Sequence, residues 1–374
     1  MDTESAGLLE IPFFGPARAQ SDLADELLAV SRRILESGAS LQSRDVADFE
    51  RSIASRADRA HGIAVGSATD GLFFALKTLG IGPGDQVLVP ALSFVASASA
   101  ILRAGAVPVF VDVDDAGQID LAAAQTALTP ATRALLAVHL YGNMLDPAAL
   151  RDFASAHGLR VIEDAAQAFG AAHGATPAGK MGDISVFSFD PTKVLGAPGS
   201  GGMVVTDDAD HAERVRALRY HGKLGSAFTE LGYNSQMPSL VAGMLNVKLT
   251  RHDEWTASRQ RVAARYDAAL ASTPASLPDI APAVEHARHK YTFRLEGRDE
   301  LAAHLKARGV PTRIHYASIL PDEPMFRETG PAGRNSDFPT ARAITRETLS
   351  LPIHAYLSER ELARVTDALR DYFA

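Results

Sequence analysis

One lysine stands in a short polar turn between two apolar stretches of this sequence, in the run Phe187-Ser-Phe-Asp-Pro-Thr-Lys193. Residues 184–189 and 203–206 are typical of buried strands on either side of it. Burying an ammonium is costly, so a lysine in such a position often performs chemistry. Desolvation lowers the pKa of a lysine and yields a neutral amine that attacks carbonyl groups. A loop lysine with its ammonium in solvent is an equally open interpretation of this stretch alone.

An aspartate, Asp164, ends another apolar run at 160–164 and precedes Lys193 by 29 residues. A strand-end carboxylate followed by a lysine suggests a site for pyridoxal 5'-phosphate. In such a site the carboxylate keeps the pyridine nitrogen protonated, and the lysine forms a Schiff base with the aldehyde. The alternative for Asp164 is a helix N-cap for the residues that follow it.

Further polar or aromatic residues follow other predicted strands. Phe94 could stack on a planar ring or simply pack in the core. Ser67-Ala68-Thr69 precedes a predicted helix, where backbone N–H groups could bind a phosphate or Ser67 could cap the helix. The glycines of 199–202 are expected to let the backbone pass close to the lysine and a ring. The spacing of the histidines at 139, 221 and 315 does not suggest a metal site, so no metal is expected.

Strands alternate with helices through the first two thirds of the chain, and the strands read as continuous apolar runs. This pattern predicts an α/β fold, with a three-layer, mostly parallel sheet covered on both faces. Ligands bind beyond the carboxyl ends of such strands. The predicted strands are 63–65, 86–90, 107–113, 133–139, 160–164, 184–189 and 203–206.

We predict a large cofactor-binding domain over 1–250, with an N-terminal arm at 1–20, and a smaller C-terminal α+β domain over 251–374. One long helix from 238 to 270 is expected to link them. In the small domain, 290–295 and 311–316 are predicted strands and the C-terminal residues are predicted to be helical. Ser21 is expected to cap a helix that buries Leu23, Leu27, Leu28 and Ile34, and 222–232 to form an irregular loop.

The composition narrows the class of protein. The 374 residues are 46% hydrophobic and 22% charged, as in ordinary globular proteins. A net charge of -8 without a basic run argues against nucleic acid or an anionic membrane as partner. The chain has no cysteine, which excludes disulfides and thiolate catalysis, and no apolar run approaches the roughly 18 residues of a membrane helix. The polar N-terminus does not resemble a signal peptide. A cytoplasmic enzyme or binding protein is expected.

Over nearly its whole length the sequence resembles the DegT/DnrJ/StrS family of sugar aminotransferases, which have the aspartate aminotransferase fold (type I). The segments that carry the resemblance are Ile11-Pro-Phe-Phe14, 65–72, 80–87, 108–112, 163–170, 187–193, 201–202, 232–234, His315-Tyr316 and 349–352.

The resemblance implies a role for each matching residue. Lys193 would form the Schiff base and move protons, while Asp164 pairs with the pyridine nitrogen. The remaining cofactor contacts would be Phe94 on the ring, Gln167 beside the ring hydroxyl, Ala68, Thr69 and Ser188 at the phosphate, and Asn234 from a partner subunit, which makes a homodimer with shared sites. His315 and Tyr316 are candidate substrate contacts.

The chain departs from the family pattern at two places. Ala68 stands where relatives commonly have glycine, and Pro321 stands where a histidine near the sugar is common. The first is a small change beside the phosphate, and the second affects substrate recognition.

The expected activity is transfer of an amino group from L-glutamate, or alternatively from glutamine, to a ketone of a nucleotide-linked deoxysugar. Three alternatives are a ketocyclitol aminotransferase of aminoglycoside-type biosynthesis, a lyase-type relative (a sugar dehydratase or an aminohydroxybenzoate synthase), and a non-catalytic regulatory protein on the same fold. The presence of Lys193 disfavours the dehydratases that replace it.

Overall fold

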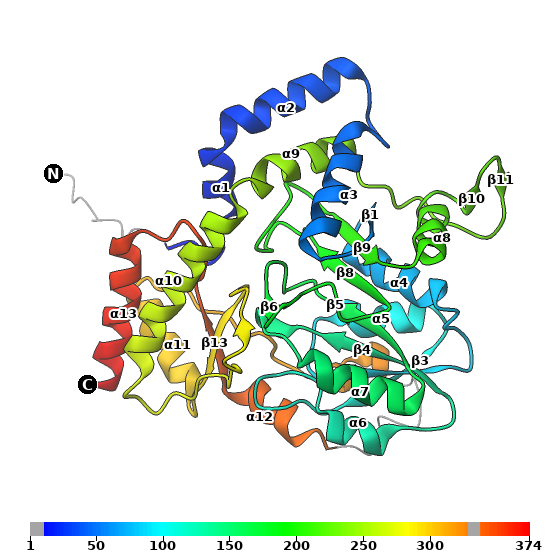
Figure 1. Ribbon diagram of the computed structural model, residues 1–374. Helices are drawn as coiled ribbons and strands as arrows, with labels where there is room; N and C mark the ends of the chain where they lie inside the picture. The colour runs from blue at the N-terminus through cyan, green and yellow to red at the C-terminus, as the bar shows by residue number, and fades with distance from the viewer. Residues whose placement is uncertain (1–10, 328–336) are drawn as a thin grey trace.

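A seven-stranded sheet forms the centre of the molecule in the computed structural model, which describes residues 11–327 and 337–374 (Figure 1). The strand order is β1-β9-β8-β5-β4-β2-β3, and β9 runs antiparallel to both of its neighbours, whereas β8, β5, β4, β2 and β3 are parallel. The predicted α/β, mostly parallel fold is therefore confirmed. The strands are β1 (His61–Val65), β2 (Gln86–Pro90), β3 (Val107–Val111), β4 (Thr132–Val138), β5 (Arg160–Asp164), β8 (Ile184–Ser188) and β9 (Gly202–Thr206).

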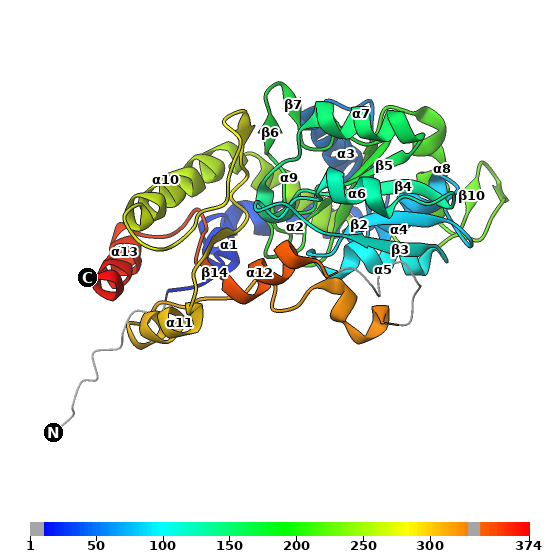
Figure 2. The ribbon, with the colours of Figure 1, turned by 90° about the horizontal axis from the view of Figure 1, so that it is seen from below.

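Helices cover both faces of this sheet, which is why its strands are apolar along their whole length (Figure 2). One face packs against α4 (Ala68–Thr78), α5 (Val95–Arg103) and α8 (Ala209–Arg219). The other face packs against α3 (Arg44–Arg56), α6 (Leu121–Ala127), α7 (Pro147–His157) and α9 (Ser239–Leu249).

The carboxyl ends of the central parallel strands meet at one edge of the sheet. Asp164 at the end of β5 lies level with Val138 on β4 and Val186 on β8. The helix that follows β1 starts at the same edge: Ser67 caps α4, and its hydroxyl accepts the backbone N–H of Asp70. This register places the residues that follow each strand around a common space.

A second, smaller core lies beside the sheet. It surrounds the antiparallel pair β13 (Tyr291–Arg294) and β14 (Thr348–Leu351), and Ile11 from the N-terminal segment joins it. Its helices are α10 (His252–Leu270), α11 (Arg298–Ala307) and α13 (Glu359–Phe373). A capping box of Ser358 and Glu361 starts α13, and Arg18 donates to both oxygens of the Glu361 carboxylate, which ties the N-terminal segment to this core.

The segment between α11 and β14 packs back against the large core. Phe326 and Phe338 are buried there, along with Ile344 of α12 (Pro339–Glu347). Two turns of 3-10 helix, η2 (Leu320–Asp322) and η3 (Pro324–Phe326), precede α12. The division at residue 250 stays a prediction, and residues 1–10 of the predicted arm lie outside the described residues. The remaining short elements are β6 (Ala172–His173), β7 (Thr176–Pro177), β12 (Val284–Glu285) and η1 (Leu140–Gly142).

Four local predictions were wrong. The helix predicted over 238–270 is broken between Leu249 and His252 into α9 and α10. Residues 311–316 form no strand apart from one bridge, Arg313 to Ser350, and the partner of β13 is β14, in the region predicted to be helical. The loop 222–232 contains a hairpin, β10 (Lys223–Leu224) and β11 (Ala227–Phe228).

The N-terminal helix prediction was also wrong in detail. Ser21 lies inside α1 (Pro16–Asp22) and does not cap a helix; α2 (Ala24–Ser37) follows it. Leu23, Leu27 and Ile34 are buried as expected, whereas Leu28 is 68% exposed.

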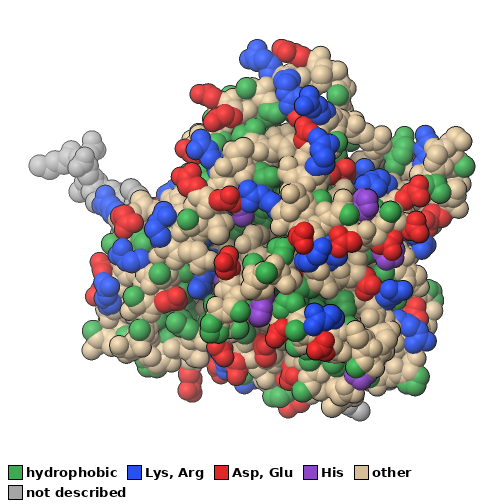
Figure 3. All heavy atoms as spheres, viewed as in Figure 1, with side chains coloured by type: hydrophobic (Ala, Val, Ile, Leu, Met, Phe, Trp, Pro, Cys, Tyr) green, Lys and Arg blue, Asp and Glu red, His purple; other side chains and the backbone are tan. Residues whose placement is uncertain are grey.

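The surface carries a mixed charge. Figure 3 shows acidic and basic side chains interspersed over the face seen in Figure 1. Among the described residues, no helix is both long and apolar enough to cross a membrane.

Candidate active site

A cavity of about 280 Å³ lies at the carboxyl edge of the sheet. It is lined by nine of the ten predicted cofactor and substrate residues: Ala68, Thr69, Phe94, Asp164, Gln167, Ser188, Lys193, His315 and Tyr316. The tenth, Asn234, does not line it; this residue is exposed and pairs with Tyr220 in an isolated bridge. Pro321 lies in η2 and does not line it either.

Asp164 is 5% exposed and lies at the floor of this cavity. One carboxylate oxygen accepts the Ser97 hydroxyl at 2.7 Å, and the other accepts the Ala166 N–H at 3.1 Å. Burial raises the pKa of Asp164, and the hydrogen bond from Ser97 and the charge of Lys193 partly oppose this. No cation lies within ion-pair distance of Asp164 among the described residues, so this carboxylate is suited to a protonated group of a ligand.

The turn that carries Lys193 is held by its own backbone and side chains. The Asp190 carboxylate accepts the N–H and the hydroxyl of Thr192 at 3.0 and 2.7 Å, and the Lys193 N–H donates to the Asp190 carbonyl at 2.9 Å. Burial lowers the pKa of Lys193, and the charges of Asp164 and Asp190 partly oppose this. A lowered pKa increases the neutral, nucleophilic fraction of this amine.

The start of α4 approaches the glycines that follow the lysine turn. A Cβ on Gly202 would lie 2.5 Å from the carbonyl carbon of Ser67 and 2.6 Å from the N of Ala68, whereas one on Gly201 would lie 3.0 Å from Met237. The closeness of these glycines to a ring stays a prediction. Gly202 gives clearance to the Ser67-Ala68 backbone, because β9 pairs beside β1, which leads into that turn.

The opposite wall of the cavity is aromatic and polar. Phe94 is 51% exposed, with its ring 6.3 Å from that of Tyr316, so it is available to a ligand and is not a core residue. Gln167 accepts the Tyr141 N–H at 2.9 Å and donates to the Tyr316 hydroxyl at 3.2 Å. Burial raises the pKa of Tyr316 to about 12, and burial lowers the pKa of His315 to about 3, so both are neutral near pH 7.

Sequence reasoning missed four residues that line the cavity or support it. Ser97 donates to Asp164, and Phe14, His289 and Lys290 line the wall next to Lys193. Phe14 lies within the segment that carries the family resemblance, but nothing local shows that it reaches a cavity formed by residues more than 50 positions away.

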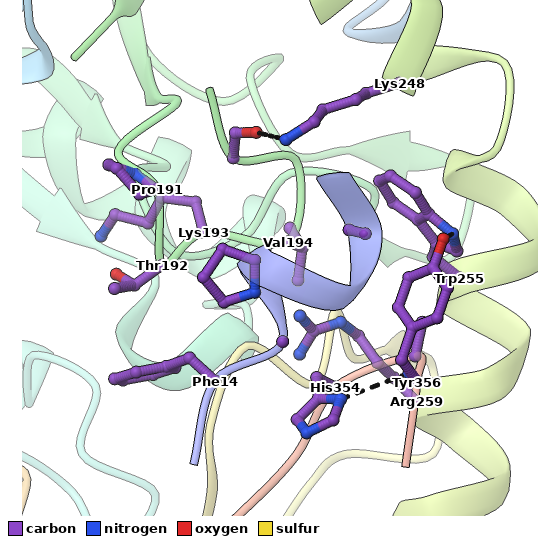
Figure 4. Close-up of a pocket in the computed structure, with 15 residues that line it drawn as sticks. Phe14, Pro191, Thr192, Lys193, Val194, Lys248, Trp255, Arg259, His354 and Tyr356 are labelled. Atoms are coloured by element: carbon purple, nitrogen blue, oxygen red, sulfur yellow. Dashed lines mark hydrogen bonds between the residues drawn. The ribbon is translucent and has the colours of Figure 1, made fainter. Parts of the chain in front are cut away.

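A smaller cavity of about 40 Å³ lies behind the lysine turn. Figure 4 shows it, with the Lys193 side chain turned away from Trp255 and Lys248. The Lys248 ammonium donates to the Gly196 carbonyl at 2.7 Å, which anchors the far side of the turn. The Lys193 amine and the Lys248 contact that supports its turn therefore lie on opposite sides of one loop.

Glu163, next to Asp164, is fully buried and collects the hydrogen bonds that hold the strand end. Its carboxylate accepts the backbone N–H of Gly179 and Met181 and the Ser185 hydroxyl at 2.6 to 2.9 Å, and it contacts His139 Nε2 at 2.9 Å. Burial alone would raise the pKa of Glu163. The hydrogen bonds outweigh this effect, the one with His139 most of all, and lower the pKa to about 2.

We expect Glu163→Gln to lower the free energy of unfolding by about 3 kcal/mol. The substitution replaces one carboxylate oxygen, an acceptor, by an amide N–H₂, which is a donor and cannot accept the hydrogen bonds that this oxygen received. The depressed pKa means that the ionised carboxylate stabilises the fold above pH 4.5 and that this contribution is lost as the pH falls toward 2. Urea unfolding at pH 7 and pH 4 measures both effects, with the exposed Glu213→Gln on α8 as control. Equal stability of the wild type and Glu163→Gln at pH 7 would contradict this account.

The comparisons with known proteins agree with this geometry. The sequence profile of the DegT/DnrJ/EryC1/StrS aminotransferase family matches residues 21–370. The dTDP-3-amino-3,4,6-trideoxy-alpha-D-glucose transaminase of Streptomyces venezuelae is 40% identical over 97% of this chain and 96% of its own length. The crystal structure of S. venezuelae DesV in complex with a ketimine intermediate superposes with a TM-score of 0.93 at 39% identity, covering 97% of this chain and 98% of that one. The PLP form of a putative sugar aminotransferase from Streptococcus pneumoniae has a TM-score of 0.88 at 26% identity and covers 97% of this chain and 98% of its own.

The fold, the cavity and these similarities together define an aminotransferase. The chain belongs to the DegT/DnrJ/EryC1/StrS aminotransferase family.

Proposed function

We propose that this protein is a pyridoxal-phosphate-dependent aminotransferase that moves an amino group from L-glutamate to a ketone of a nucleotide-linked deoxysugar. The observation that carries the proposal is that Lys193 and Asp164 line one cavity, with the start of α4 at the same edge. Family membership supports the reaction class.

The residues around the cavity fit pyridoxal phosphate. Asp164 is buried, and among the described residues no cation lies within ion-pair distance of it. The 11-residue helix α4 begins at the cavity beside Thr69, and Phe94 presents an exposed ring. When bound, pyridoxal phosphate supplies an electron sink for the carbon that loses a proton during transamination. Asp164 would hold a proton on the ring nitrogen, Gln167 would lie beside the ring hydroxyl, and Lys193 would bind the aldehyde and then carry the proton.

The substrate class rests on the relatives and on the mouth of the cavity. The Streptomyces relative is named for a dTDP-linked amino sugar, and at 40% identity over 97% of this chain it supports a nucleotide-linked acceptor here. His315 and Tyr316 line the cavity, where they would contact the sugar. We therefore propose His315 and Tyr316 as contacts of the substrate. Pro321 does not line the cavity and is not proposed as a contact.

We infer that the active form is a homodimer in which Asn234 of each subunit completes the phosphate site of the other. Asn234 is exposed and lies in the segment that leads away from the projecting hairpin β10–β11, which carries exposed apolar side chains (Figure 1). Phe228, in the hairpin, is 69% exposed and Leu231, three residues after it, is 77% exposed; large apolar side chains exposed so close together favour burial against a second copy.

The test incubates the purified protein, loaded with pyridoxal phosphate, with L-glutamate and then with either a dTDP-linked keto-deoxysugar or a ketocyclitol. We expect glutamate alone to bleach the yellow cofactor and release 2-oxoglutarate, and the keto-sugar to restore the colour and become aminated. Amination of the ketocyclitol alone would replace the proposed substrate class. A protein that stays colourless with added cofactor would overturn the enzyme itself. Analytical ultracentrifugation of the same sample measures its oligomeric state. A monomer that retains activity would exclude the proposed dimer.

A further inference from the structure

A second lysine, Lys290, lines the same cavity as Lys193. It is 6% exposed and is held at the start of β13, where its backbone N–H donates to the Tyr141 carbonyl at 3.2 Å. The proposed transamination assigns it no role.

The Lys290 ammonium lies against an aromatic ring and not against a carboxylate. Its Nζ is 4.1 Å from the ring centroid of Phe14, and the Arg313 guanidinium lies 5.2 Å from the same centroid. Among the described residues, neither cation has a carboxylate within ion-pair distance. A nearby acid, Asp190, already accepts two hydrogen bonds from Thr192.

Such an arrangement leaves the N–H donors of a buried cation free. A ring face attracts the ammonium but accepts no conventional hydrogen bond from it, and a buried lysine has three donors to satisfy. Burial, together with the positive charges of Lys193, Arg259 and Arg313, lowers the pKa of Lys290 to about 6, and the charge of Asp190 partly opposes this. An anion that enters the cavity would pair with these donors and restore the charge of Lys290. The other titratable groups on this wall are His289 and His315, and burial lowers the pKa of both.

We propose that Lys290 is the binding site for a carboxylate of the amino donor. This inference rests on the proposed function, because it assigns the donor to the cavity that Lys193 and Asp164 line. The Lys290 side-chain nitrogen packs against the Phe14 ring, and the exposed Arg313, whose guanidinium lies 5.2 Å from the centroid of the same ring, adds positive charge beside it.

The position of Lys290 favours a donor carboxylate over the diphosphate of a nucleotide sugar. The α-carboxylate of an amino acid is one bond from the carbon that must react beside Lys193, so its partner has to lie inside the cavity. A diphosphate is separated from the reacting ketone by part of the sugar ring and extends toward solvent. Lys290 is inside and nearly inaccessible, which matches the first ligand.

The experiment measures binding of two unreactive probes to the cofactor-loaded, full-length protein by titration calorimetry. Glutarate represents the donor and dTDP represents the acceptor. We expect Lys290→Met to weaken glutarate about tenfold, as for loss of one charge-assisted hydrogen bond, and to change dTDP less than twofold. Lys290→Arg should recover most of the glutarate affinity, and Lys306→Met on the exposed face of α11 should match the wild type.

A second readout separates this role from a merely structural one. Because Lys290 should gain a proton when a carboxylate binds, glutarate titrations at pH 8 in buffers of different ionisation enthalpy should show net proton uptake in the wild type and less in Lys290→Met. If Lys290→Met does not fold, Lys290→Gln takes its place. Unchanged glutarate affinity in the substituted protein would overturn the proposal, and so would equal weakening of both probes or weakening of dTDP alone. If the proposed function itself is wrong, the protein will not turn yellow with pyridoxal phosphate, and this is seen before any probe is added. Failure of the proposed function is therefore distinguishable from failure of the Lys290 proposal.

Discussion

Lys193→Ala is expected to abolish covalent attachment of pyridoxal phosphate and to slow transamination by roughly 10³–10⁴-fold. The reason is positional: the Lys193 amine faces the cavity from a turn fixed by Asp190 and Thr192, and its pKa is lowered by burial. Borohydride reduction followed by mass spectrometry of the peptides measures attachment, and production of 2-oxoglutarate from glutamate measures the rate.

Two substitutions make this result specific. Lys193→Arg keeps the positive charge but cannot form the bond, so it should also lose attachment. Lys290→Met removes the other lysine of the cavity and should keep attachment at Lys193. Labelling of Lys290 instead of Lys193 in the wild type would show that the reactive lysine is misassigned.

Asp164→Asn is expected to slow the glutamate half-reaction by roughly 10²–10³-fold, the size of effect seen when one preorganised charge partner is removed from a buried site. Asp164 is 5% exposed, and its carboxylate meets only the Ser97 hydroxyl and the Ala166 N–H among the described residues. A neutral amide there would no longer favour a proton on the ring nitrogen. Stopped-flow absorbance with L-glutamate measures the rate.

Ser97→Ala is the matched control for this prediction. It keeps the carboxylate and removes the 2.7 Å hydrogen bond that orients it, so we expect a loss of about tenfold. The test is the order of the two rates: Asp164→Asn should react more slowly than Ser97→Ala. Equal rates would show that Asp164 does not hold the proton on the ring nitrogen.

Much of the central sheet and its covering helices could be predicted because these elements depend on local patterns. Continuous apolar runs predicted the parallel strands, and the polar residues after them predicted one edge of the sheet as the site. The C-terminal part was predicted less well. β14 lies in a region predicted to be helical, and it is a strand because it pairs with β13, more than 50 residues earlier in the chain. The break between α9 and α10 also depends on tertiary packing. Leu245 of α9 packs in the core against the sheet, whereas Tyr266 of α10 packs in the small core around β13, so the two helices belong to different cores.

The sequence by itself determined that Lys193, Asp164 and the turn before α4 would share one edge, because parallel strands bring their carboxyl ends together whatever the details of packing. Tertiary structure alone decided which residues complete the cavity. Phe14 reaches Lys290 across more than 270 residues, and Gly202 makes room for the backbone of Ser67. Such contacts leave no local pattern, because they depend on how the small core and the N-terminal segment close against the sheet. The class of reaction can therefore be predicted from the motif around Lys193. The proposed donor site at Lys290 could not be predicted, because it depends on how the N-terminal segment and the small core pack against the sheet.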